Sequence, residues 1–508
     1  KPTPNLNLGI EVDGELNQLN SLHPELQAFN GKLSGNVRLN GPYISPTARL
    51  NVKLASFIHK ETPPYDIHLQ GQYDSHHLKI NDLQLTAPDG GSAKIQGDLS
   101  LKDTFATDFQ ATLKDASIGH ILDASGLPDA WIRAPISGNL SGGGTIFPLS
   151  LKAKAALSLS HFDTLASTYA NPKSTKILKL QNGRIDADVS IEPTFCAVSN
   201  GRIQSGNSKL ALEGTFYYAT NRGMNLHFSS RQFHFADIDT IANVPFRGSG
   251  DIAGTIEGPY NDPVISATTE LTNFGILEYD IGTTKATLIY SDLVLDIPRI
   301  GIRQGAGTIK GSGNLNFRTK ALETAGNFEL NNIPTRTLLD SIIMTTRDAK
   351  RFGGVVSGRA MVQGPIRSAM GVVRLKSPNL IIDGSNLGAA RLLTNFGEEA
   401  ELLTINLNVK PKKGSISAYY ALLPKSKMVL KTTLNEIEAP LLTPMMGNIA
   451  LNGTLTGEAN LQGPPSGLNG TINLKADNLE AFGVSLETTH INGLSSNGTI
   501  NLNGTTFS

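Results

Sequence analysis

Apolar and polar residues alternate with a period of two along most of this 508-residue chain. In an extended strand a period of two places alternate side chains on opposite faces, so this pattern is typical of half-buried antiparallel strands. The clearest stretches are residues 50–54, 185–191, 293–297, 403–409 and 472–476. The sequence therefore predicts an all-β protein in which each strand has one apolar and one polar face.

Three of these stretches predict which side chains form the apolar surface. We expect their apolar members to line one continuous interior: Leu50, Val52, Leu54, Leu293, Leu295, Ile297, Leu403, Ile405, Leu407 and Val409. The polar residues between them should point to water, because neighbours along a strand face opposite ways. These polar residues are Asn51, Lys53, Asp296, Thr404, Asn406 and Asn408.

A glycine-rich strand signature returns at intervals of about a hundred residues, which indicates a repeat architecture. It spans residues 35–43, 138–144, 254–260, 358–365 and 457–464, and all copies except the second close on Gly-Pro. Short apolar clusters precede the later copies, at residues 118–122, 238–242, 335–339 and 439–443. Since such clusters are too short for independent helices, we expect one or two helical turns that cap a group of strands. Asn-Gly pairs at 30–31, 182–183, 200–201, 469–470 and 497–498 predict hairpin turns.

These landmarks divide the chain into repeats within one continuous elongated domain. We expect the end of a preceding repeat at residues 1–30, followed by repeats at 31–135, 136–247, 248–353 and 354–447 and a partial repeat at 448–508. The pattern is already under way at the first residue and stops in mid-hairpin. We therefore expect the sequence to be part of a longer polypeptide, with any membrane anchor or export signal outside it.

Composition narrows the possible functions. Lysine plus arginine and aspartate plus glutamate are 44 each, so the net charge is zero and no overall basic field favours nucleic acid. Cys196 is the single cysteine, so no intrachain disulfide can form. Aromatic residues make up only 6% of the chain, which favours an extended sheet over a filled sandwich interior.

Catalytic and cofactor motifs are weak. His59, His68, His76 and His77 fall close together but lack the spacing of a zinc site, and solvated positions explain them better. The glycine clusters at 248–254 and 305–311 lack the final spacing and the helix of a dinucleotide loop. We therefore expect no enzyme activity, no cofactor and no metal.

The glycine strands that lead into Gly41-Pro42-Tyr43 and Gly258-Pro259-Tyr260, together with the apolar caps, resemble the TamB and AsmA-like family of envelope proteins. The resemblance covers nearly the whole chain. It implies a β-taco, an elongated repetitive antiparallel sheet folded into a U with an apolar groove and short helical caps between repeats. It also implies a location in the periplasm of a diderm bacterium, an inner-membrane anchor, and a bridge between the inner and outer membranes that carries phospholipid. An outer-membrane barrel of the TamA type is the implied protein partner.

The residues themselves favour the same mechanism. A sheet with one continuous apolar face must pack on something or hold something, because burying apolar surface gains roughly 25 cal/mol per Å². With no segment suited to form a covering layer, we expect a trough for acyl chains. One alternative is a scaffold or chaperone for outer-membrane protein assembly, which would present sheet edges or the trough to nascent strands. An adhesin-like β-solenoid is less well supported, because solenoid rungs repeat every 20–30 residues or so.

Overall fold

The structure, a computed structural model, describes residues 5–16, 18, 29–59, 64–102, 104–118, 132–165, 176–180, 182–219, 221–241, 245–260, 262–276, 279–319, 321–342, 349–397, 402–446, 450–464, 467–481, 483–496 and 499–507. Strands make up 78% of it, and they pair antiparallel. The predicted fold class, an all-β protein built on a long repetitive taco-like sheet, is confirmed. The chain divides into two compact units, unit 1 with residues 1–269 and 290–292 and unit 2 with residues 270–289 and 293–508.

Unit 1 is built on antiparallel strands that pair almost entirely in chain order. Its main strands are β1 (Asn5–Glu15), β2 (Phe29–Pro42), β3 (Thr47–His59), β4 (Tyr65–Asp74), β5 (His77–Thr86), β6 (Ser92–Ser100), β7 (Ala106–Ser117), β9 (Pro135–Thr145), β10 (Ser150–Leu159), β13 (Gly183–Ile191), β14 (Phe195–Ser205), β15 (Ser208–Tyr217), β16 (Met224–His234) and β18 (Phe246–Gly258). Each pairs with the next in this list.

A second, four-stranded sheet accounts for the strands that this order omits. It joins β8 (Ile132–Arg133), β11 (Phe162–Leu165), β12 (Lys176–Leu180) and β17 (Ile238–Ile241) in that order. The 3-10 turn η3 (Phe235–Asp237) comes just before β17. The sequence analysis did not foresee this sheet, because its short strands come from segments far apart in the chain.

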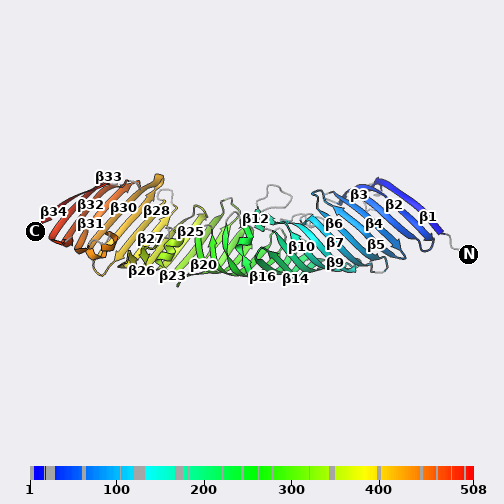
Figure 1. The fold of residues 1–508 in the computed structure, drawn as a ribbon, viewed down its shortest axis with the longest axis horizontal. Helices are drawn as coiled ribbons and strands as arrows, with labels where there is room; N and C mark the ends of the chain where they lie inside the picture. Colours follow the sequence, from blue (N-terminus) through cyan, green and yellow to red (C-terminus); the bar gives the residue numbers. More distant parts are fainter. Residues whose placement is uncertain are drawn as a thin grey trace. The chain divides into compact units, whose positions relative to one another are not determined.

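Unit 2 follows the same scheme, and in Figure 1 its strands succeed one another in chain order from green to red. Its paired strands are β21 (Val294–Gln304), β22 (Gly307–Asn316), β23 (Glu323–Pro334), β25 (Val355–Pro365), β26 (Met370–Ile382), β27 (Ser385–Phe396), β28 (Leu403–Lys410), β29 (Ser415–Leu423), β30 (Lys427–Glu438), β31 (Leu451–Gly463), β32 (Asn469–Ala481), β33 (Val484–Ser496) and β34 (Thr499–Phe507). The short β24 (Phe352–Gly353) pairs with the end of β26. Strands β19 (Val264–Ile276) and β20 (Tyr279–Ser291) each contribute residues to both units.

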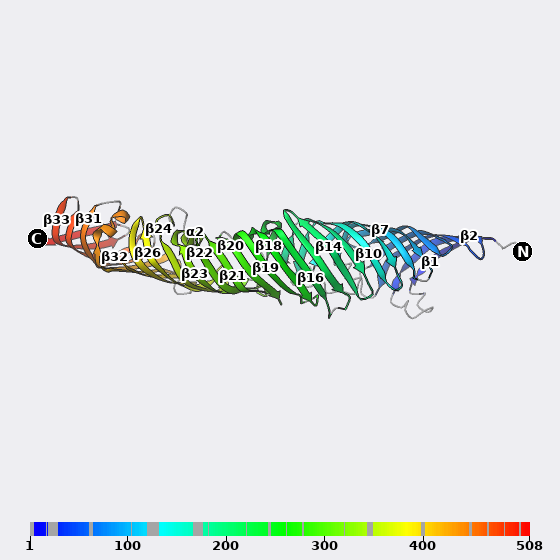
Figure 2. The ribbon, with the colours of Figure 1, turned by 90° about the horizontal axis from the view of Figure 1, so that it is seen from below.

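The predicted helical caps are found at two of four places. Residues 335–339 lie in helix α2 (Thr335–Ile342), which lies against β23 and β24 (Figure 2). Residues 439–443 fall in the 3-10 turns η5 (Ala439–Leu441) and η6 (Thr443–Met446); a further 3-10 turn, η4 (Pro424–Ser426), joins β29 to β30. The cap predicted at 238–242 is wrong, because Ile238–Ile241 is strand β17, whose backbone pairs with β12. Most of the cap at 118–122 lies outside the described residues.

Three of the Asn-Gly pairs form no hairpin turn. Residues 30–31, 200–201 and 469–470 lie inside strands β2, β14 and β32. Asn200 has a φ of 51° where the register between β13 and β14 shifts. The readiness of asparagine to adopt a left-handed conformation thus serves a β-bulge here, where the sequence analysis expected a turn. The pair at 497–498 lies outside the described residues.

Candidate functional site

In unit 1 the apolar residues of successive strands meet in rows across the sheet. The pairing registers join Leu33, Leu54, Ile67, Leu85, Ala93, Leu113, Gly138, Leu157, Ile185, Ile203 and Leu210 into one such row. Paired residues lie on the same face of a sheet, so this row and its neighbours form a single apolar face. The predicted residues Leu50, Val52 and Leu54 all belong to it, in register with Gly71, Leu69 and Ile67.

In unit 2 an equivalent row crosses the sheet. It contains Ile302, Ile309, Leu330, Gly358, Leu375, Leu392, Leu407, Ala418, Thr432, Ala459 and Ile472. Leu403, Ile405, Leu407 and Val409 alternate along β28 and therefore share the face of this row. Leu295 pairs with Leu315 of β22. Leu315 lies four positions along that strand from Gly311, which pairs with Phe328. An even separation keeps side chains on the same face, so Leu295 lies on the face of this row. Within each unit, the structure thus places the residues that the sequence singled out on one face, with the exception of Leu293.

The predicted lining residues are mostly half-buried, as expected for a face without a complete second layer. Leu50, Val52, Leu54, Leu295, Ile297, Leu403, Ile405 and Leu407 are all half-buried, whereas Val409 is only 1% exposed. Leu293 is also half-buried, but it lies in the turn just before β21 with a φ of 59° and does not take part in the strand. The apolar face therefore keeps part of its aliphatic surface in contact with solvent.

The polar residues between them follow the prediction with one exception. Asn51, Lys53, Asp296 and Asn408 are exposed, and Asn406 is half-buried. Thr404 was expected to point to water but is only 4% exposed. It lies on the polar face in register with Ala421, which is itself 1% exposed. Alternation therefore assigns the face of Thr404 correctly but not its exposure.

The first glycine of every signature lies on the apolar face, close to the next strand. Gly35, Gly138, Gly254, Gly358 and Gly457 share this environment: a Cβ atom at any of them would lie under 3 Å from backbone atoms of that strand. For Gly35 the nearest Cα would be that of Val52, at 2.9 Å. The recurrence of the signature therefore has a steric cause, because only glycine allows the strands to approach this closely on the apolar side.

A hydroxyl group placed just before three of these glycines supports a β-bulge. Asn332 has a φ of 51° at the bulge of β23, and its backbone N–H donates to Oγ of Ser357 at 2.9 Å. The same bond joins Asp115 to Ser137 (2.8 Å) and Glu436 to Thr456 (3.1 Å). The bulges re-aim the chain so that Ile333 and Ile437 become fully buried. The Ser-Gly or Thr-Gly dipeptide was a sequence signal for this feature that the sequence analysis missed.

Parts of the apolar face are covered by the caps, contrary to the expectation that no segment would cover it. Leu338 of α2 packs on the cluster of Leu330, Ile333, Val356 and Leu375. Leu441 of η5 packs on Leu380, Leu387, Ala390 and Val409. In unit 1, Phe162 from the small sheet packs on Ala134, Ile136 and Leu159. These covers are short, so they cover the face only locally.

The third signature also carries a polar anchor. The hydroxyl of Tyr260 donates a hydrogen bond to the carbonyl oxygen of Tyr217 at 2.8 Å. Burial raises the pKa of Tyr260 to about 12, with smaller contributions from Cys196 and Tyr218, so the hydroxyl remains a donor at neutral pH. In the first signature, by contrast, Tyr43 is 67% exposed.

Groups suited to metal or redox chemistry do not assemble in the described part of the chain. No cluster of three or more histidine, cysteine, aspartate or glutamate side chains there could hold a metal ion. His68 is half-buried and hydrogen-bonds to Asn51, and His77 is exposed and hydrogen-bonds to Asp98. Burial raises the pKa of the Cys196 thiol. The described helices also include none that is long and apolar enough to cross a membrane.

Comparison with known proteins does not assign the chain to a family. No model of a known protein family matches the sequence, and a search of curated proteins found no significant match. The function must therefore be argued from the apolar face itself.

Proposed function

We propose that this protein holds and conducts the acyl chains of phospholipid along its apolar face. The observation that carries this proposal is the series of mainly aliphatic, mostly half-buried side chains that continues from strand to strand within each unit, with glycines such as Gly138 and Gly358 between them. A core that packed against a complete second layer would bury these residues. Each methylene of an acyl chain that moves from water onto such a face gains about 0.8 kcal/mol, so the tails need no polar recognition.

The resemblance of the signatures to the TamB and AsmA-like family supports a place for this activity in the cell. We propose that the chain belongs to that family, is anchored in the inner membrane of a diderm bacterium, and carries phospholipid across the periplasm to the outer membrane. A barrel of the TamA type would be its partner there. No catalytic step is required, because lipid movement along a continuous surface needs only weak, repeated contacts.

Charges placed on the apolar face test this proposal. Val52→Asp and Ile405→Asp each force an acyl chain to pass an ion that must stay hydrated, which costs several kcal/mol. Asn51→Asp is the matched control, because Asn51 is exposed on the opposite face and a carboxylate there can still accept the bond from His68. Two quantities are measured in cells that carry each variant at equal protein level. They are the integrity of the outer membrane and the amount of phospholipid that co-purifies with the protein.

The expected result is a loss of integrity and of bound phospholipid in both interior variants, with Asn51→Asp unchanged. If the interior variants retain both properties, lipid conduction is wrong. If they bind no less lipid but outer-membrane barrels no longer assemble, the scaffold function replaces it.

A further inference from the structure

A second feature lies on the opposite, polar face of unit 2. A groove of about 1020 Å³ crosses β22, β23, β25, β26, β27 and β28. Arg359, Arg374, Lys376 and Arg391 line it, and they alternate with the apolar-face residues Leu375 and Leu392. The side chains of these cations therefore lie on the face opposite the proposed lipid path, although Leu375 and Leu392 of the apolar face also border the groove.

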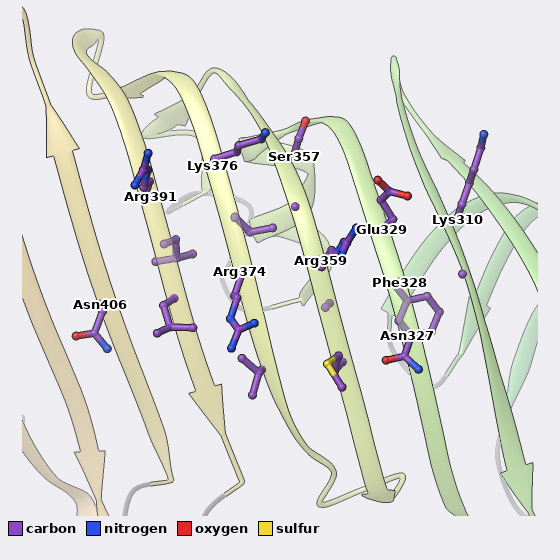
Figure 3. A pocket seen from close by; sticks show the side chains of 18 of the residues that line it. Lys310, Asn327, Phe328, Glu329, Ser357, Arg359, Arg374, Lys376, Arg391 and Asn406 are labelled. Carbon is purple, nitrogen blue, oxygen red and sulfur yellow. The ribbon is translucent and has the colours of Figure 1, made fainter.

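The groove concentrates positive charge. Its charged lining residues are Lys310, Arg359, Arg374, Lys376, Arg391 and a single carboxylate, Glu329. Arg359 of β25 lies directly opposite Arg374 of β26. Lys376 of β26 lies directly opposite Arg391 of β27. Figure 3 shows Ser357, Lys376 and Arg391 at one level of neighbouring strands, with Arg359 and Arg374 at the next level along the strands.

These cations are not neutralised within the described residues. None of the five has an ion pair or a side-chain hydrogen bond there, although Glu329 is in register with Lys310 and Arg359. Elsewhere in the described chain, lysines on exposed strand positions do find carboxylates, as Lys285 does with Glu270 (2.7 Å) and Lys475 with Asp477 (2.8 Å). Like charges directly opposite one another destabilise a sheet, so two adjacent pairs of this kind indicate a surface that is shaped for an anionic ligand.

The shape and the remaining lining residues narrow the class of ligand. The groove is concave, which does not match the flat surface of a membrane, but it can receive a protruding segment of another protein. Six strands at about 4.8 Å spacing make it roughly 24 Å long, the length of about seven extended residues. Apolar side chains lie among the cations, and one of them, Met361, is 57% exposed. We propose that this groove binds an extended acidic segment of a partner protein, with its carboxylates on the arginines and lysine and an apolar side chain against Met361.

Binding of a labelled acidic peptide to the full chain tests this assignment. The probe is a fluorescein-labelled decapeptide of alternating glutamate and alanine, whose glutamates share one face when it is extended; the same peptide with glutamine at each glutamate is its control. Fluorescence anisotropy should show binding of the glutamate peptide that weakens with added salt. The double variant Arg374→Glu, Lys376→Glu should weaken binding about tenfold or more, since charges across an interface set its specificity. A second double variant, Arg359→Glu with Arg391→Glu, tests two other cations of the same groove in the same way.

The matched control is Lys412→Glu with Lys413→Glu, which changes the net charge equally at exposed positions in the turn between β28 and β29. It should bind the peptide as the unmodified chain does. Equal losses in control and groove variants, no loss in either groove variant, or equal binding of the glutamine peptide would overturn the proposal. So would groove-dependent binding to phosphatidylglycerol vesicles without binding to the peptide, which would mark a membrane contact. The groove variants should retain co-purified phospholipid, so this test is independent of the apolar face.

Discussion

Gly358→Ala should destabilise the sheet of unit 2 far more than the size of a methyl group suggests. The new Cβ would lie 2.9 Å from Cα of Leu375 and from the carbonyl carbon of Arg374, and closer still to the carbonyl oxygen of Arg374. All three are backbone atoms of β26, which pairs with β25 at this point, so they cannot swing aside as a side chain would. We expect a cost of about 3 kcal/mol, at the upper end of the range for overpacking. That cost corresponds to an increase of roughly a hundredfold in the local opening equilibrium.

Hydrogen exchange of the amides in the β25–β26 ladder measures this opening directly. Gly9→Ala is the control, because nothing lies within 4 Å of a Cβ at Gly9 on β1 and its backbone is not left-handed. There we expect no loss, or a gain of about 0.4–1 kcal/mol from the less flexible unfolded chain. If protection of the β25–β26 ladder falls less than threefold in Gly358→Ala, the steric explanation of the signature glycines is wrong.

Three further results are expected. Ser357→Ala removes the acceptor for the Asn332 N–H and should destabilise the bulge by about 1 kcal/mol. Hydrogen exchange of the Asn332 amide measures this loss, and an amide that stays fully protected would contradict it. Hydrogen bonds from Arg351 at 2.9 and 2.7 Å hold the pKa of Asp383 below its usual range. The pair therefore stabilises the fold at pH values above the ordinary aspartate pKa of about 3.9, and this stabilisation is lost as the pH falls below that value. In Arg351→Ala the Asp383 carboxyl should titrate nearer its ordinary value by NMR; an unchanged value would contradict the assignment. Burial raises the pKa of Cys196, so iodoacetamide should modify it much more slowly at pH 8 than an exposed thiol, and equal rates would show that the thiol is accessible.

The sheet could be predicted because its information is local. A period of two specifies strands wherever one face is apolar, and the alternation along residues 403–409 assigned each β28 side chain to the correct face. The caps at 335–339 and 439–443 were also visible as apolar clusters before a glycine strand. Residues 238–242 carry a similar cluster, but there a long-range pairing with β12 overrode the helical spacing. Local spacing cannot report the partner of a strand.

The other missed features depend on register, which the sequence does not display. The bond between Asn332 and Ser357 joins residues on two strands, and neither residue is unusual by itself. The basic groove was hidden by a net charge of zero, because charge balance over the whole chain says nothing about which cations face one another. Only the pairing of β25, β26 and β27 places Arg359 opposite Arg374 and Lys376 opposite Arg391.

The central claim is that the apolar face holds acyl chains, and site-specific photo-crosslinking in cells tests it most directly. A photoreactive phenylalanine is placed at Leu54 or Leu295 on the apolar face, and at their exposed neighbours Lys53 or Asp296 on the polar face. The adducts are identified by mass spectrometry. We expect phospholipid adducts at Leu54 and Leu295 and none at Lys53 and Asp296. Lipid adducts at all four positions alike, or only protein adducts at Leu54 and Leu295, would contradict the account.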